Sequence, residues 1–202
     1  MMSLREAYSF VMVGVGGQGT ILASDILAEV GMEAGFDVKK AEVHGMSQRG
    51  GSVISHVRWN RDRVYSPLVG LGEADILIAF EKLEALRFAE YLRRGGMALV
   101  NEMVLLPVTV TVGGVPYPED RALEEAIKAL EGILLRVPGE SLAKEAGNVK
   151  AANVVLLGSI STLLPLDEAA WWSCLERRIP PKFLELNRKA FALGRQAVRP
   201  PS

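Results

Sequence analysis

The amino-acid sequence predicts an α/β fold in one domain, residues 1–202, with a mostly parallel sheet covered by helices and further helices at the C-terminus. Three observations predict it. Short apolar runs of strand length alternate with stretches of helical periodicity. A glycine-rich turn joins the first apolar run to the first helical stretch. No internal repeat, low-complexity tract or linker divides the chain.

The first half of the chain is expected to alternate between strands and helices. An apolar run stopped by glycine predicts a buried strand, and apolar residues recurring every three or four positions up to Gly31 and Gly35 predict a helix. A strict alternation of side chains predicts the third strand, which a polar turn at residues 60–63 ends. The expected elements are strand Phe10–Val13, helix Ile21–Val30, strand Phe36–Val43, strand Ser52–Trp59 with Val64–Tyr65 pairing back, strand Ala74–Phe80 and helix Glu81–Arg94.

The second half follows the same rules. Gly95 and Gly96 end the preceding helix, and β-branched residues after Pro107 favour a strand. The expected elements are strands Met97–Val100, Val108–Val112 and Ile133–Val137, and helices Glu119–Leu130, Asn153–Leu164, Asp167–Arg177 and Lys182–Val198. The pair Trp171 and Trp172 fits either an interface or core packing.

Composition excludes several classes of protein. The 23 basic and 24 acidic residues leave a net charge of -1, which argues against nucleic-acid binding and against a polybasic membrane anchor. The single cysteine, Cys174, cannot form an internal disulfide or hold an iron–sulfur cluster alone. With only two histidines, a structural zinc site is not expected. The longest apolar stretch, Val154–Leu166, is shorter than the roughly 20 residues that span a bilayer, and the N-terminus does not fit a signal peptide. A cytoplasmic location is expected.

The glycine-rich turn is the first candidate site. Its sequence, Gly14-Val15-Gly16-Gly17-Gln18-Gly19, matches G-x-G-x-x-G between a strand and a helix, which predicts a Rossmann-like domain. Backbone N–H groups at the start of the helix near Thr20 would bind a phosphate or another anion. The residues expected to bind it are Gly14, Gly16, Gly17, Gln18, Gly19 and Thr20.

Two alternatives to anion binding stay open at this turn. The glycines could serve only a tight connection between strand and helix. A bound NAD would need an acidic residue about 20 positions further on. Glu42 is near that place, but Lys39, Lys40 and His44 around it suit an adenosine-ribose pocket poorly.

The next loop carries a resemblance to a known family. The stretch Ala41–Val53, with the sequence AEVHGMSQRGGSV, resembles the small (beta) subunit of indolepyruvate:ferredoxin oxidoreductase. Arg49-Gly50-Gly51 resembles a feature of the wider pyruvate/2-oxoacid oxidoreductase gamma domains. The glycine turn, Glu73-Ala74-Asp75, and Asn153 with Leu156-Leu157-Gly158 are similar to the same family, so the likeness covers nearly the whole chain.

The resemblance implies a subunit of an enzyme complex that is not active alone. In such families a large (alpha) subunit carries thiamine diphosphate, magnesium and iron–sulfur clusters. The complex oxidises an aryl 2-oxoacid with coenzyme A to the acyl-CoA, carbon dioxide and reduced ferredoxin. The small subunit holds no cofactor of its own, in agreement with the single cysteine. A homodimer of the isolated chain stays open.

The loop from His44 to Gly51 is the second candidate site. Its cation, imidazole and amides suit contact with a partner or a substrate, but no nucleophile and base lie together in the sequence. His44 and Arg49 are the candidates for catalysis, as an acid or base and as a two-point anion ligand. The residues expected to face the partner or substrate are His44, Met46, Ser47, Gln48, Arg49, Gly50 and Gly51. The alternative function is a stand-alone NAD(P)- or nucleotide-binding Rossmann-type protein.

Overall fold

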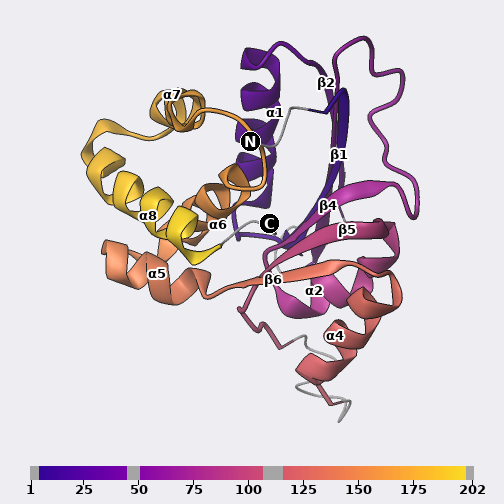
Figure 1. Ribbon diagram of the computed structural model, residues 1–202. Helices are drawn as coiled ribbons and strands as arrows, with labels where there is room; N and C mark the ends of the chain where they lie inside the picture. The colour runs from indigo at the N-terminus through magenta and orange to yellow at the C-terminus, as the bar shows by residue number, and fades with distance from the viewer. Residues whose placement is uncertain (1–4, 45–50, 107–115, 199–202) are drawn as a thin grey trace.

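The computed structural model describes residues 5–44, 51–106 and 116–198. Within them, one six-stranded sheet has the order β2-β3-β1-β4-β5-β6 (Figure 1). The strands are β1 (Ala7–Val15), β2 (Asp37–His44), β3 (Ser52–Asn60), β4 (Ala74–Ala79), β5 (Leu92–Asn101) and β6 (Ile133–Val137). Neighbours among β1, β4, β5 and β6 are parallel, whereas β3 runs antiparallel to both β1 and β2. The expected mostly parallel α/β sheet is therefore confirmed.

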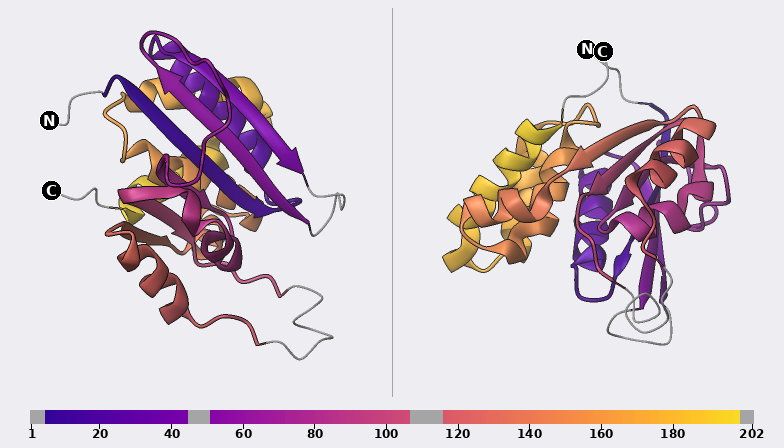
Figure 2. Two further views of the ribbon diagram at one scale, coloured as in Figure 1. Left: turned by 90° about the vertical axis from the view of Figure 1, so that its right-hand side faces the viewer. Right: turned by 90° about the horizontal axis from the view of Figure 1, so that it is seen from below.

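Helices cover both faces of this sheet (Figure 2, right). They are α1 (Thr20–Glu33), α2 (Lys82–Arg87), α4 (Asp120–Ala129), α5 (Gly139–Ala146), α6 (Ala152–Ser161), α7 (Glu168–Arg178) and α8 (Leu184–Ala197), with 3-10 turns η1 (Ala89–Tyr91), η2 (Val149–Ala151) and η3 (Pro181–Phe183). On one face, α1 and the C-terminal helices share a core with Phe10 and Trp59. On the other, α2 and α4 pack over Val11, Leu77 and Val100. Both faces of β1 and β4 are buried, which explains their continuous apolar sequences.

Two expectations about the middle of the chain are wrong. The helix expected over Glu81–Arg94 ends at Arg87, and β5 already begins at Leu92. Leu92 is fully buried and pairs with Ala74 of β4, so tertiary packing overrides the local helical pattern. Val64–Tyr65 forms no strand, because the Val64 amide donates to the Asp37 carboxylate at 2.7 Å rather than to a strand partner.

Two further differences concern the second half. The helix α5 has no counterpart in the sequence prediction, because its eight residues are too few to carry a clear period. The strand expected at Val108–Val112 lies outside the described residues. The remaining expected elements are present with shifted ends, as is usual for boundaries.

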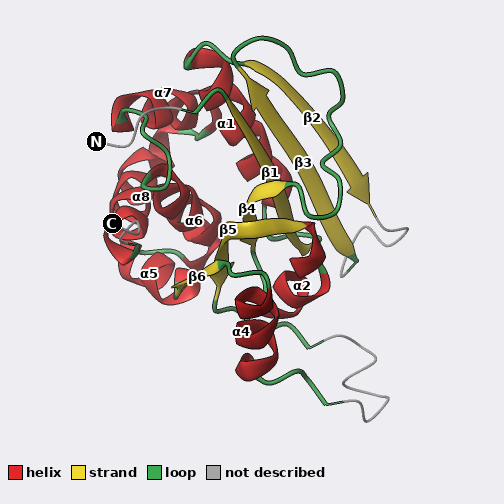
Figure 3. Cartoon of the chain, turned by 45° about the vertical axis from the view of Figure 1, so that its right-hand side comes forward, coloured by secondary structure: helices red, strands yellow, loops and turns green. Residues whose placement is uncertain are grey.

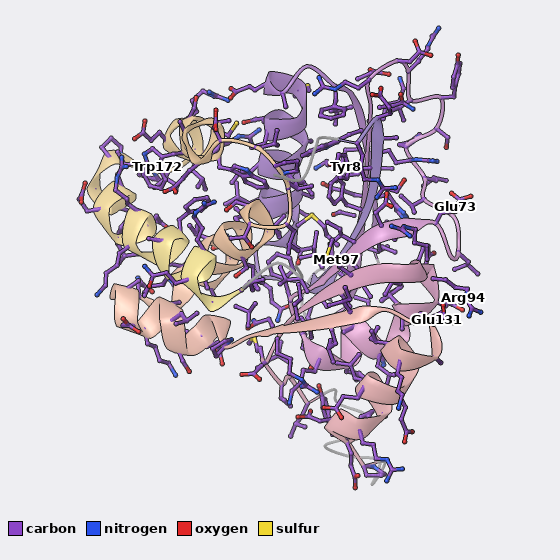
Figure 4. The ribbon with its side chains drawn as sticks, in the orientation of Figure 1. Tyr8, Glu73, Arg94, Met97, Glu131 and Trp172 are labelled. Carbon is purple, nitrogen blue, oxygen red and sulfur yellow. The ribbon has the colours of Figure 1, made fainter. Side chains whose placement is uncertain are left out.

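The C-terminal helices form a compact layer against α1. Trp171 is fully buried and Trp172 is 9% exposed, and both belong to the core. Trp172 is labelled in Figure 4. Its indole donates to Glu176 and lies under the Arg188 guanidinium, 4.2 Å from ring centroid to Cζ. Of the two roles considered for this pair, core packing is the one the structure supports.

The reactivity of Cys174, in α7, tests how tightly the C-terminal helices pack. Its side chain is fully buried, and burial raises the pKa of the thiol to about 11. We expect a maleimide to label it very slowly in the native chain and rapidly after unfolding in urea. The folded chain keeps a proton that the unfolded chain loses, so this thiol should make stability fall as pH rises from about 9 to about 11. Equal labelling rates in both states, or an identical alkaline pH dependence in Cys174→Ala, would contradict this burial.

Candidate functional site

The glycine-rich turn connects β1 to α1 at the carboxyl edge of the sheet. Gly17 and Gly19 have φ angles of +102° and +80°, a region that other residues rarely adopt. A Cβ added to Gly14 would lie 2.6 Å from Thr20 Oγ1 and 3.0 Å from the Phe80 Cβ. Side chains at these positions would therefore strain the turn or collide with its neighbours.

Gln18 holds the turn together from inside. Its Oε1 accepts the Val15 amide at 2.7 Å, and its Nε2 donates to the Phe80 carbonyl at 3.3 Å and to Met103 Sδ at 3.2 Å. The Gln18 side chain thus joins the ends of β1 and β4 to the segment that follows β5. It fixes the path of the backbone that the sequence predicts to bind an anion.

Among the residues that the structure describes, no side chain caps the start of α1. The first helical hydrogen bond runs from the Ala23 amide to the Gly19 carbonyl at 3.0 Å, so the earlier N–H groups of the first turn have no helical partner. The Thr20 hydroxyl is 3% exposed at the residue level and has no hydrogen-bond partner within the described residues. Unpaired donors and the positive end of the helix dipole favour an anion here.

A cavity of about 490 Å³ opens beside this turn. It is lined by Gly17, Gln18, Gly19, Phe80, Asn101, Met103, Glu140, Val149, Lys150, Ala152 and Asn153. The walls come from the carboxyl ends of β1, β4 and β5 and from the start of α6. Open α/β sheets bind ligands at this edge, and the volume is typical of small-molecule sites.

Three polar side chains at the cavity have different roles. A Cβ added to Gly19 would lie 2.7 Å from Asn153 Nδ2, so the Asn153 side-chain amide packs against the glycine turn. Asn101 is buried, donates to the Phe80 carbonyl at 3.1 Å and accepts the Gly139 amide at 3.0 Å, which ties β4 to α5. Lys150 brings a positive charge that the sequence prediction missed. No local pattern identifies it, because the α5–α6 connection that carries it reaches the turn only through the fold.

The second candidate loop begins at the same edge of the sheet, at the end of β2, and ends beside the glycine turn. β2 and β3 form an antiparallel hairpin in which His44 pairs with Val53 (Figure 3). The Gly16 amide donates to the Gly51 carbonyl at 3.0 Å, and Val15 pairs with Ser52. The candidates Met46, Ser47, Gln48, Arg49 and Gly50 lie outside the described residues, and so does the side chain of His44. The structure therefore places the Gly51 end of the loop beside the glycine turn and leaves the loop side chains untested.

The position of Glu42 does not support an adenosine-ribose pocket. β3 separates β2 from β1, so β2 lies two strand spacings, roughly 10 Å, from the strand that leads into the glycine turn. Glu42 also contacts the Lys40 ammonium, which bonds Asp25 of α1 as well. Burial is the largest single influence on the Lys40 pKa and lowers it. The hydrogen bonds and charges of Asp25 and Glu42 together outweigh burial, so the Lys40 pKa is raised.

Buried acids follow β4 at the same edge. Glu81 is 1% exposed and accepts the Glu84 amide at 3.0 Å, the Leu105 amide at 3.1 Å and the Tyr117 hydroxyl at 2.5 Å. Burial raises the pKa of Glu84, and burial together with Glu81 raises that of Tyr117. These contacts fix the chain after β5, so we assign Glu81 a structural role.

The part of the chain that the structure describes shows neither a metal centre nor a membrane span. Among residues 5–44, 51–106 and 116–198, no group of three or more His, Cys, Asp or Glu side chains is placed to hold a metal ion. In the same part of the chain, no helix combines the length and the apolar character needed to cross a bilayer.

Comparison with known proteins agrees with the sequence motifs. A family model described as pyruvate ferredoxin/flavodoxin oxidoreductase matches residues 9–197. The indolepyruvate oxidoreductase subunit IorB of Thermococcus kodakarensis is 41% identical over 200 residues, covering 96% of this chain and 97% of that protein.

Solved structures share the fold. A keto/oxoacid ferredoxin oxidoreductase gamma subunit from Geobacter sulfurreducens PCA matches with a TM-score of 0.69 and 26% identity, over 94% of this chain and 97% of that one. A 2-oxoglutarate:ferredoxin oxidoreductase from Magnetococcus marinus matches with a TM-score of 0.75 and 20% identity, over 96% of this chain but 31% of its own. The latter likeness establishes the fold alone. The resemblance carried by the glycine turn and the Ala41–Val53 motif is confirmed: the chain belongs to the pyruvate ferredoxin/flavodoxin oxidoreductase family, whose matching members include subunits of oxoacid oxidoreductases.

Proposed function

We propose that this chain is the small subunit of a cytoplasmic 2-oxoacid:ferredoxin oxidoreductase that acts on aryl 2-oxoacids such as indolepyruvate and forms the acyl-CoA. The observation that carries the proposal is 41% identity to an IorB subunit of nearly equal length. Thiamine diphosphate, magnesium and the iron–sulfur clusters belong to the large subunit. The single cysteine of this chain, Cys174, supports this for the clusters, which usually need about four cysteine ligands. The whole chain acts as one gamma-type domain, and ferredoxin is reduced through the complex.

The cavity at the glycine turn is the anion-binding part of this site. The unpaired N–H groups at the start of α1, the Asn153 amide and the Lys150 ammonium converge on it. Glu140 on the same wall opposes a second negative charge nearby, which favours one phosphate group over an extended polyanion. One phosphate group of coenzyme A, the co-substrate of the proposed reaction, is the ligand group of this chemistry.

The loop from His44 to Gly51 faces the active site of the large subunit. Gly51 is bonded to Gly16 of the glycine turn, and the loop begins at the end of β2 on the same edge. This edge holds no nucleophile–base pair within the described residues, so the chain positions and shields groups that the partner transforms. The β3 strand between β1 and β2 argues against the alternative of a stand-alone NAD(P)-binding protein.

Lys150→Ala is expected to weaken the binding of coenzyme A to the isolated chain about tenfold, because a cation beside a phosphate contributes on the order of 1.4 kcal/mol. Lys128→Ala, at an exposed position of α4, an element that contributes no residue to the cavity, is the matched control and should bind as the wild type does. Isothermal titration measures both affinities. Equal affinities for the two variants, or a crystal soaked in phosphate with this cavity empty, would contradict the assignment.

A further inference from the structure

The connection between β3 and β4 exposes three large hydrophobic side chains. Tyr65 is 82% exposed, Leu68 is 53% exposed and Leu71 is 61% exposed. The connection, residues 61–73, lies over the face of the sheet away from α1, on the right of Figure 1. We call these three side chains, with Arg58 and Arg63, the β3–β4 surface. Exposed apolar groups that gather in one short segment mark an interaction site more often than scattered ones do.

The backbone beneath this surface is fixed. Val64 and Val69 are buried, and the Val69 amide donates to His56 Nδ1 at 3.3 Å. The Gly72 amide donates to the Glu90 carbonyl at 2.8 Å. The exposed side chains therefore belong to a segment whose backbone is held by buried residues and hydrogen bonds. An ordered surface loses less conformational entropy when it binds.

The arginines near this segment lack the close carboxylate partners that the other described arginines have. In the described residues, every other arginine has a carboxylate oxygen within 3.1 Å. Arg58 is 3.9 Å from Glu73, Arg61 bonds the Ala34 carbonyl and covers the Phe36 ring, and Arg63 lies over the Tyr65 ring. Arg58, Arg63 and Tyr65 also line a hollow of about 240 Å³. Guanidinium groups without a close carboxylate can pair with carboxylates on the surface of a binding partner.

We propose that the β3–β4 surface docks an acidic, partly apolar surface of the large subunit, at a second contact away from the active edge. This inference rests on the proposed function. Tyr and Arg are the residue types enriched at protein interfaces. The hollow reaches Ala7 at the start of β1, whereas the glycine turn follows its last residue, so roughly 30 Å of strand separates the two. This contact holds the subunits together without touching the reacting groups.

Other occupants fit the surface less well. A two-fold contact with a second copy would bring the same arginines face to face, which is repulsive. Anionic membranes attract clusters of four to eight basic residues, whereas this surface has only Arg58 and Arg63, and Asp62 and Glu73 offset their charge. The same fold forms 31% of the longer Magnetococcus marinus chain, where a covalent link holds it to the rest. When this fold is a separate chain, only non-covalent contacts through its surface can hold it to the large subunit.

The test uses the full-length small subunit and the purified large subunit. Tyr65→Ser with Leu68→Ser is expected to raise the dissociation constant of the complex about 30-fold, the effect of losing one strong interface residue. Turnover at saturating small subunit should stay unchanged. Met32→Ser, which alters a side chain of similar exposure (54%) on α1, is the matched control and should bind as the wild type does. Arg63→Glu should weaken assembly at low salt and less so at high salt.

Each outcome has a defined meaning. A double variant that folds and binds the large subunit within threefold of the wild type overturns the inference. Two other results also overturn the inference. In the first, the wild type binds phosphatidylserine vesicles and the double variant does not, while the double variant still binds the large subunit normally. In the second, the wild type self-associates and the double variant does not, again with normal binding to the large subunit. If the wild type itself neither binds nor activates the large subunit, the proposed function fails, and this result is distinct from a failure of the double variant alone.

Discussion

Replacing Gly194 with alanine is expected to destabilise the folded chain by about 3 kcal/mol. A Cβ at this position in α8 would lie 1.9 Å from the Val155 carbonyl oxygen in α6. The obstacle is backbone, so the two helices would have to move apart and the Ser159–Gly194 hydrogen bond of 2.9 Å would lengthen. In an uncrowded helix the same substitution stabilises by about 1 kcal/mol. The sign of the change in the free energy of unfolding therefore tests the close contact.

Urea unfolding measures this effect. Gly158→Ala should act in the same direction, because its Cβ would lie 2.1 Å from the Phe191 carbonyl oxygen. Gln196→Ala, which adds an alanine at an exposed position of α8, is the control and should change stability by less than about 0.5 kcal/mol. A Gly194→Ala chain as stable as the wild type would mean that α6 and α8 do not pack at this distance.

Arg49→Ala is expected to lower turnover of the reconstituted complex, or to weaken its assembly, by roughly 30-fold or more. The reason is that losing a desolvated two-point contact of a guanidinium costs about 2 kcal/mol or more. Arg49 lies in sequence between β2 and Gly51, whose carbonyl accepts the Gly16 amide of the glycine turn. The isolated variant should unfold within about 0.5 kcal/mol of the wild type, because Arg49 is outside both strands.

The measurement mixes the wild-type or variant small subunit with the large subunit and follows 2-oxoacid-dependent ferredoxin reduction. Arg121→Ala is the matched control, since that arginine is exposed on α4 and pairs only with Glu125 among the described residues. Unchanged assembly and unchanged rates across concentrations of substrate and coenzyme A would return Arg49 to the role of an ordinary surface arginine.

Local patterns predicted the parts of the site that depend on neighbouring residues. The glycine turn needs φ angles that glycine supplies at Gly17 and Gly19, and a strand before it and a helix after it are legible in the sequence. The alternation in Ser52–Trp59 likewise predicted β3. The structure places Gly51, the last residue of the second candidate loop, beside this turn because β3 pairs directly with β1.

Long-range packing decided what the sequence could not show. The insertion of β3 between β1 and β2 moves Glu42 away from the glycine turn, although its spacing along the chain suits a dinucleotide site. Lys150 reaches the cavity because α5 and α6 fold back over the carboxyl edge. Leu92 pairs with β4 although its neighbours favour a helix. In each case the deciding partner is distant in sequence, so no local window contains it.

Reconstitution with the large subunit tests the central claim most directly. Each purified subunit is assayed alone and in a mixture, with indolepyruvate, coenzyme A and ferredoxin. The account predicts that neither subunit reduces ferredoxin alone and that the mixture does, with a rate that saturates as this chain is added. Oxidation of a substrate by this chain alone with NAD(P), or ferredoxin reduction by the large subunit at full rate without it, would contradict the account.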